Sequence, residues 1–218
     1  MDRSWLSPPG LRDCRSVSEV CIRKVGARLD EGNFVSGKIA SLTVRLEGIS
    51  EDVIYLLPFF TSGHFDAHTK EDVRKGLLGS VYAPKNFFEI DPDLISPPGA
   101  ADLGDLVKSG AITDADLDDF LDERQRTRIR TAQELSSFGH WKELEDCVGA
   151  DVLTQLIGRA ELRTLVKTAH GLGKRVIFDL IFNKPLQNYL SGIAPFWIER
   201  CGFDVSASMP ARLLIAHS

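Results

Sequence analysis

The chain has 218 residues, a net charge of −5, and hydrophobic and charged contents of 43% and 26%, which are ordinary values for a globular protein. The basic residues are scattered, and this charge excludes a general nucleic-acid binder, which needs a basic face to meet phosphates. The N-terminus lacks the apolar stretch of a secretory signal, and the longest apolar runs are only strand-length. We therefore expect a cytoplasmic protein without a membrane segment.

The first third of the chain predicts two helices and then a strand. Residues 12–29 place valines and a cysteine at helical spacing, and residues 39–46 repeat that spacing before Gly48 ends it. Residues 53–57 are β-branched, aliphatic and aromatic, and Pro58 follows them. This composition predicts a strand that is buried on both faces, as parallel strands are.

The middle of the chain predicts a loop followed by helices. Glycines and prolines interrupt every periodic stretch of residues 61–95, which we therefore expect to be loop. Residues 96–150 have a different character and indicate a helical insertion within a single domain that spans residues 1–218. Thr113 and Asp116 have the spacing of a capping box, which predicts a solvated surface helix from there to about residue 135.

The last third has the clearest pattern. Apolar residues repeat at helical spacing over 162–169, and Gly171 follows, which predicts a helix end. Residues 175–183 then predict a second buried strand, residues 189–200 a further helix, and a weak strand begins near Phe203. This alternation of helices and apolar strands predicts an α/β fold with parallel strands.

Cysteine and histidine spacings give no sign of a cofactor or a metal. The cysteines form no CxxC pair, and two of them, seven positions apart, would share one face of the first predicted helix as small buried thiols. A pair of histidines four apart fits a polar loop better than a metal site, because no further ligands are evident. The residues concerned are Cys14, Cys21, Cys147, Cys201, His64 and His68. We predict no cofactor and no metal.

Four segments, in order, resemble the α-amylase family, glycoside hydrolase family 13. VIYLLPFF (53–60) is similar to the family's second barrel strand, and GSVYAPKNFFEIDPDL (79–94) to a loop whose aromatic residue packs on the sugar. LRTLVKTAHGLGKRVIFDLIFN (162–183) resembles the helix and third strand and is the strongest match. WIERCGFD (197–204) is similar to the helix before the fourth strand. The resemblance implies a partial (β/α)8 TIM-barrel-like domain with parallel strands and a helical insertion, matching the N-terminal half of that barrel.

Three residues carry over from the family as substrate-binding positions. Tyr82 matches the sugar-stacking aromatic residue, although an ordinary loop or core tyrosine fits the sequence equally well. Asp179 matches a site-orienting carboxylate, and its alternative is a strand-end carboxylate held by backbone donors. Lys184 stands where the family has a sugar-contacting histidine. Asn183 matches a calcium ligand, but the family's small domain is reduced here to a few residues, so we predict no calcium site.

No catalytic residue carries over. The family's retaining mechanism needs two carboxyl groups roughly 5–5.5 Å apart. An ungapped match of residues 202–209 to the family's fourth strand places Met209 at the nucleophilic aspartate and Ala207 at the neighbouring arginine. Asp204 matches an earlier aspartate of the same strand. The acid/base glutamate belongs to a later strand of the family, which this sequence does not reach.

Three functions follow as hypotheses. The first is a truncated or degenerate α-amylase-family domain of α-glucan metabolism that is inactive alone. The second is an active α-glucan hydrolase or transglucosidase completed by another chain or by further sequence. The third is a non-catalytic carbohydrate-binding or regulatory protein. The expected partner is an α-glucan oligosaccharide, and a partial barrel exposes strand edges, which predicts a homo-oligomer that covers the open barrel edge.

Overall fold

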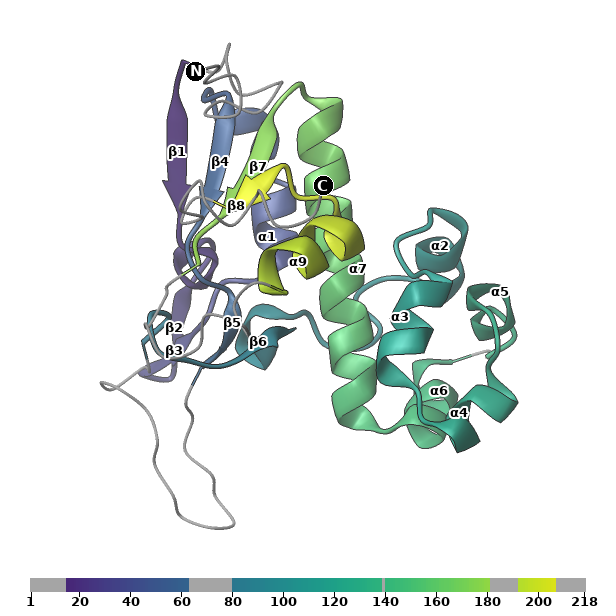
Figure 1. Cartoon of the computed structure of the whole chain (residues 1–218). Coiled ribbons are helices and arrows are strands. Elements are labelled where there is room, and N and C mark those ends of the chain that lie inside the picture. The colour runs from purple at the N-terminus through teal and green to yellow at the C-terminus, as the bar shows by residue number, and fades with distance from the viewer. Residues whose placement is uncertain (1–14, 63–79, 139, 181–191, 207–218) are drawn as a thin grey trace, which may run out of the picture.

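The computed structural model describes residues 15–62, 80–138, 140–180 and 192–206. Its centre is a four-stranded parallel sheet in the order β1, β4, β7, β8 (Figure 1). The strands are β1 (Val17–Val20), β4 (Val53–Leu56), β7 (Arg175–Phe178) and β8 (Val205–Ser206). The predicted α/β class with parallel strands is confirmed. Within the described residues the sheet stays open, so a barrel is not seen.

The first strand of the sheet was not expected, because residues 12–29 predict a helix. That prediction is wrong. Val17–Val20 pair in parallel with Val53–Leu56, and the Asp52 carboxylate accepts the backbone N–H of Arg15 at 2.8 Å just before β1 begins. Pairing with a neighbouring strand overrides the local helical spacing, which rests on only four small apolar residues.

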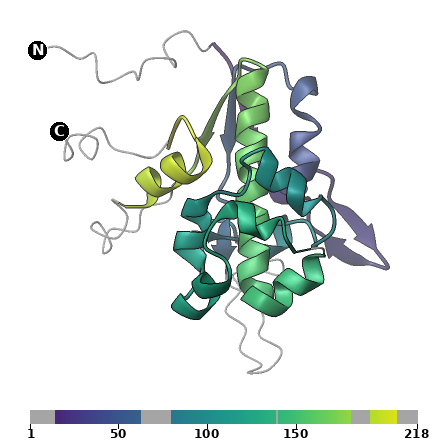
Figure 2. The same cartoon turned by 90° about the vertical axis from the view of Figure 1, so that its right-hand side faces the viewer.

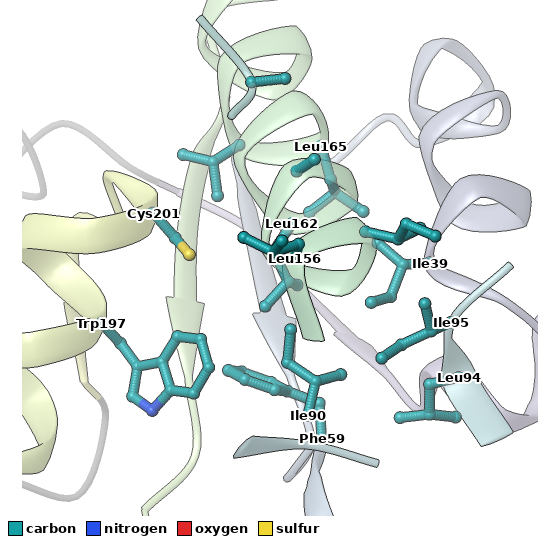
Figure 3. Packing of buried hydrophobic residues seen from close by; sticks show 14 of the residues in the cluster. Ile39, Phe59, Ile90, Leu94, Ile95, Leu156, Leu162, Leu165, Trp197 and Cys201 are labelled. Carbon is teal, nitrogen blue, oxygen red and sulfur yellow. The ribbon is translucent and has the colours of Figure 1, made fainter. Parts of the chain in front are cut away.

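Three helices cover one face of this sheet (Figure 1). They are α1 (Ile39–Thr43), α7 (Ala150–Gly171) and α9 (Ile193–Cys201), and each falls within or overlaps a predicted helix. The strand residues that point towards them are fully buried, as in Ile54 and Phe178. Figure 3 shows the resulting core, in which Leu156 and Leu162 of α7 lie between Ile39 on one side and Trp197 on the other.

The opposite face of the sheet is only partly covered. Val17 is 59% exposed, and Tyr55 and Ile177 are half-buried. The expectation that the strands are buried on both faces therefore holds for the face that packs against the helices and fails for much of the other.

Two antiparallel hairpins lie beyond the carboxyl ends of the parallel strands (Figure 1). They are β2 (Arg28–Asp30) with β3 (Asn33–Val35), and β5 (Phe60–Ser62) with β6 (Pro84–Ile90). The loop predicted over residues 61–95 is wrong for β6, which runs for seven residues despite its proline. The Gln155 side chain on α7 bonds both backbone groups of Ile90 at 2.9 Å, which supplies contacts that the sequence pattern cannot reveal.

The segment 96–150 is helical, as predicted, but its elements are short. They are α2 (Leu103–Lys108), α3 (Asp114–Phe120), α4 (Glu123–Arg128), α5 (Ala132–Leu135) and α6 (Trp141–Val148). The single helix predicted over 113–135 is wrong, because capping boxes begin at Thr113, Asp122 and Thr131 and start a new helix each time. Figure 2 shows these helices gathered around one end of α7, and Figure 1 shows that they lie on the side of α7 away from the sheet.

A buried ionic cluster fastens α3 to α7 and α9. Asp116, 1% exposed, accepts from Arg163 at 2.9 and 3.0 Å and lies 3.5 Å from Arg159. Asp119 contacts Arg159 at 2.5 Å and Arg200 at 2.7 Å. Burial opposes ionisation of Asp119, but its bonds from Arg200 and Arg159 outweigh burial and lower its pKa. The helical segment is thus fixed to the sheet domain by charges that are paired and largely removed from water.

Candidate functional site

Four polar side chains come together at the carboxyl edge of the sheet. Glu19 of β1 pairs in register with Tyr55 of β4, which in turn pairs with Ile177 of β7. Asp179 follows two residues later and therefore lies on the same face. Tyr82 belongs to the segment that leads into β6. The carboxyl edge of a parallel sheet is where α/β proteins usually bind their ligands, so we call these four residues the edge site.

Asp179 and Tyr55 form the inner half of the edge site. The backbone N–H of Asp179 donates to Leu56 O at 2.9 Å, which fixes the end of β7 against β4. Burial, and then the charge of Asp179 and the hydrogen bond between the two side chains, raise the pKa of Tyr55 to about 12. Tyr55 is therefore a neutral phenol at physiological pH, and it lies close enough to Asp179 for that carboxylate to raise its pKa.

Tyr82 forms the outer, solvent-exposed half of the edge site. Its side chain is 51% exposed, while its backbone N–H donates to Ser80 Oγ at 3.2 Å. Partial burial, followed by the charges of Asp179 and Glu19, raises the pKa of Tyr82. An exposed aromatic ring therefore lies within electrostatic range of two carboxylates, so this edge of the sheet offers both a flat apolar surface and hydrogen-bond acceptors.

A layer of packed aromatic side chains supports the edge site. Phe59, which follows β4, packs edge-on against Trp197 at 5.1 Å and stacks on Phe203 at 5.7 Å. Trp197 is fully buried, and its indole N–H donates to Phe87 O of β6 at 2.8 Å. The layer therefore holds β6, and with it the segment that carries Tyr82, in place against the sheet.

A second buried cluster links β1 to the same hairpin. Arg23 follows β1 in η2 (Ile22–Lys24), and its guanidinium contacts Asp91 Oδ2 at 3.2 Å. Ser62 of β5 donates to the same carboxylate oxygen at 2.7 Å. All three residues are at most 9% exposed. The β5–β6 hairpin is thus anchored both from the β1 side and from α9.

The structure brings two of the three sequence-predicted positions together. Tyr82 and Asp179 are close enough for the charge of one to shift the pKa of the other. Lys184, with Asn183, lies outside the described residues, as do His64, His68, Ala207 and Met209.

Asp204 is described, and it lies at the other end of the sheet. It accepts from the Val176 N–H at 2.7 Å and contacts His170 Nε2 at 2.9 Å and Arg175 at 3.6 Å. These contacts place its carboxylate at the amino ends of β7 and β8, on the opposite edge from Tyr55 and Asp179. Asp204 therefore joins α7 to the start of β8 and takes no part in the edge site.

Tyr55 and Glu19 were not foreseen as site residues. Tyr55 is the one aromatic residue in an aliphatic strand, and that polar hydroxyl is a signal that the sequence does offer. Glu19 could not be recognised, because residues 12–29 predict a helix and only the strand register places Glu19 beside Tyr55.

The raised pKa of Tyr55 can be tested by alkaline titration of tyrosine absorbance. We expect Tyr55→Phe to remove a phenol that titrates near pH 12, and Asp179→Asn to move that step towards the ordinary value of about 10. The raised pKa stabilises the folded state fully below about pH 10, and this contribution is lost as the pH rises through 12. A Tyr55 step that stays near 10 in the unsubstituted protein would contradict the burial of this phenol and the effect of the Asp179 charge on it.

The remaining polar residues give no metal site in the part of the chain that the structure describes. There, no three His, Cys, Asp or Glu side chains are grouped so that they could hold a metal ion. Cys201 is buried, which raises its pKa to about 12, so it packs as a small apolar group. Cys21 follows β1 and is not on a helix. The prediction that Cys21 shares a helix face with Cys14 is therefore wrong for Cys21. Cys14 lies outside the described residues.

Comparisons with known proteins give partial similarity of structure and none of sequence. No family model and no curated protein matches the chain, and none of the described helices combines the length and apolarity needed to cross a membrane.

Among solved structures, a noncanonic maltogenic α-amylase from Thermotoga neapolitana is 14% identical with a TM-score of 0.46, and the match covers 91% of this chain and 40% of the amylase chain. An amylomaltase from Streptococcus agalactiae in complex with acarbose is 14% identical with a TM-score of 0.40, over 76% and 43% of the two chains. An α-glucosyl transfer enzyme is 16% identical with a TM-score of 0.35, over 79% and 18%. The chain thus spans less than half the length of each of these three structures, and similarities of this size assign neither a family nor an activity.

Proposed function

We propose that this chain is an α-amylase-type domain that binds α-glucan oligosaccharides at the edge site and does not hydrolyse them by itself. The observation that carries the proposal is the exposed ring of Tyr82 beside the carboxylate of Asp179. These are two of the three substrate-binding positions that the resemblance to that family implies, and the third, Lys184, lies outside the described residues.

The chemistry of the edge site suits a sugar ring. One face of a glucose unit is lined by C–H groups, which pack on an aromatic ring, and its hydroxyls donate to carboxylates. Tyr82 supplies the first kind of contact, and Asp179 and Glu19 supply the second. The backbone of Asp179 is bonded to Leu56 O, so the end of β7 that carries this carboxylate is already held against β4 before a sugar binds.

The absence of hydrolysis is part of the same proposal. Retaining hydrolysis needs a nucleophilic carboxylate and a second carboxyl group on either side of the glycosidic bond. The resemblance assigns the nucleophile position to Met209, whose thioether cannot replace a carboxylate. Asp204, the nearest carboxylate in the sequence, is occupied with Val176, His170 and Arg175 at the other edge of the sheet. We therefore expect no release of reducing sugar from maltodextrin.

Isothermal titration calorimetry with maltotetraose tests the binding. We expect Tyr82→Ala to weaken the affinity by roughly 5–30-fold, because loss of an aromatic surface of this size costs about 1–2 kcal/mol. Tyr82→Phe keeps the ring and should bind nearly as well as the unsubstituted chain.

Phe34→Ala is the matched control. Phe34 is a partly exposed aromatic residue, 36% accessible, on the other hairpin, so its removal should leave the affinity unchanged. Equal losses in Tyr82→Ala and Phe34→Ala, or no heat with any glucan, would refute the proposal. Release of reducing sugar that is lost in Asp179→Ala would refute its second part.

A further inference from the structure

A groove opens between the carboxyl end of β1 and α1. It encloses about 470 Å³, which is a usual size for a small-molecule site. Val20 and Leu42, which line it from β1 and α1, are 8% and 1% exposed. Val25, Ile49 and Leu57 extend its apolar wall as half-buried side chains. The groove can therefore take the apolar body of a ligand out of water.

Two positively charged side chains line the same groove. Lys24 is the last residue of η2, Arg45 follows α1 by two positions, and both are exposed. One guanidinium nitrogen of Arg45 lies 3.7 Å from the position that a Cβ on Gly26 would occupy, so this cation reaches the turn that directly follows Lys24. Within the described ranges, neither side chain has a carboxylate in ion-pair contact. Two like charges that share one end of a groove without a counter-charge favour an anion at that end.

Glu19 is the anionic side chain of the groove lining. It lies on β1, five positions before Lys24, and its register partner is Tyr55, so it borders the strand end of the groove and not the η2 end. Its carboxylate would repel a second negative charge on a ligand. The lining therefore suits a molecule with one negative charge at one end and no charge along the rest of its length.

We propose that this groove binds the anion of a medium-chain fatty acid, with the carboxylate between Lys24 and Arg45 and the chain along the apolar wall. The planar guanidinium can donate two parallel hydrogen bonds to a carboxylate, and the lysine adds a second positive charge. A neutral chain would meet only the wall, and inorganic phosphate would meet only the cations. This proposal does not depend on sugar binding at the edge site.

Calorimetric titration of the full chain with sodium octanoate tests the proposal. We expect saturable binding of one octanoate per chain, and weaker binding of both 1-octanol and inorganic phosphate. Lys24→Gln and Arg45→Gln should each weaken the octanoate affinity by about 3–10-fold, because each removes one charged hydrogen bond at a solvent-accessible site. Higher ionic strength should weaken the affinity as well.

Arg28→Gln is the matched control. Arg28 is an exposed cation on β2, four positions after Lys24, and does not line the groove. Its replacement removes the same charge from the same part of the chain, so the octanoate affinity should stay unchanged. Lys24 and Arg45 are themselves exposed, so all three variants should fold.

Amide NMR shifts locate the bound octanoate. Those of Val20, Val25 and Ile49 should move as octanoate is added, whereas that of Leu144, which is buried in the helical segment, should not. Absence of saturable heat, equal affinity for 1-octanol or for phosphate, an equal loss in Arg28→Gln, or shifts centred outside the groove would each overturn the proposal.

Discussion

Asp116→Ala is expected to destabilise the protein by about 3–5 kcal/mol, which is the cost of removing one partner from a buried ion pair. The carboxylate of Asp116 is 1% exposed, and the guanidinium groups of Arg159 and Arg163 converge on it. Without Asp116, both cations remain away from water with one counter-charge fewer. The total stability of a domain is about 5–15 kcal/mol, so this single change removes a large part of it.

Asp118→Ala is the matched control on the same helix. Asp118 pairs with Arg126 at the surface, where its side chain is 69% exposed, and such pairs contribute about 0–1 kcal/mol. Urea unfolding of the two variants compares a buried and an exposed aspartate of α3 directly. Similar midpoints for both would show that the ionic cluster does not fasten the helical segment to α7.

Trp197→Ala is expected to have an effect of similar size, about 3–5 kcal/mol, through the cavity it leaves. The indole fills the space between α9, Phe59 and β6 (Figure 3), and its N–H bonds Phe87 O. Loss of that bond also releases β6, so sugar affinity at Tyr82 should fall even under conditions in which the variant remains folded.

Trp197→Phe separates the two contributions. It retains most of the aromatic volume and loses the hydrogen bond to β6, so we expect a loss of about 1–3 kcal/mol. Thermal unfolding measures the stability, and calorimetry with maltotetraose measures the affinity. If Trp197→Ala unfolds at the same temperature as the unsubstituted chain, the aromatic layer is not the support of the site that its contacts indicate.

The parts of the fold that could be predicted are those with strong local patterns. The strand at 53–57, the helix over 162–169 and the strand from Arg175 have uninterrupted apolar periodicity, and each was confirmed with shifted ends. The capping box at Thr113 was also confirmed. The later capping boxes at Asp122 and Thr131 have the same signature in the sequence, and they divide the helix predicted over 113–135.

The parts that could not be predicted depend on contacts between distant residues. β1 is four residues long, and its conformation is set by pairing with β4 and by the Asp52 cap. β6 is held by Gln155, 65 positions away along the chain. The edge site contains residues of both kinds. Tyr82 and Asp179 were predicted from the resemblance to a known family. Glu19 could be placed only from the register of β1, a strand whose sequence has helical spacing.

In a crystal structure of the chain with maltotetraose, we expect a glucose ring stacked on Tyr82 within about 4 Å of its face, with a hydroxyl donating to Asp179 and the glycosidic bonds intact. A saccharide bound elsewhere on the protein, with Tyr82 left bare, would contradict this expectation.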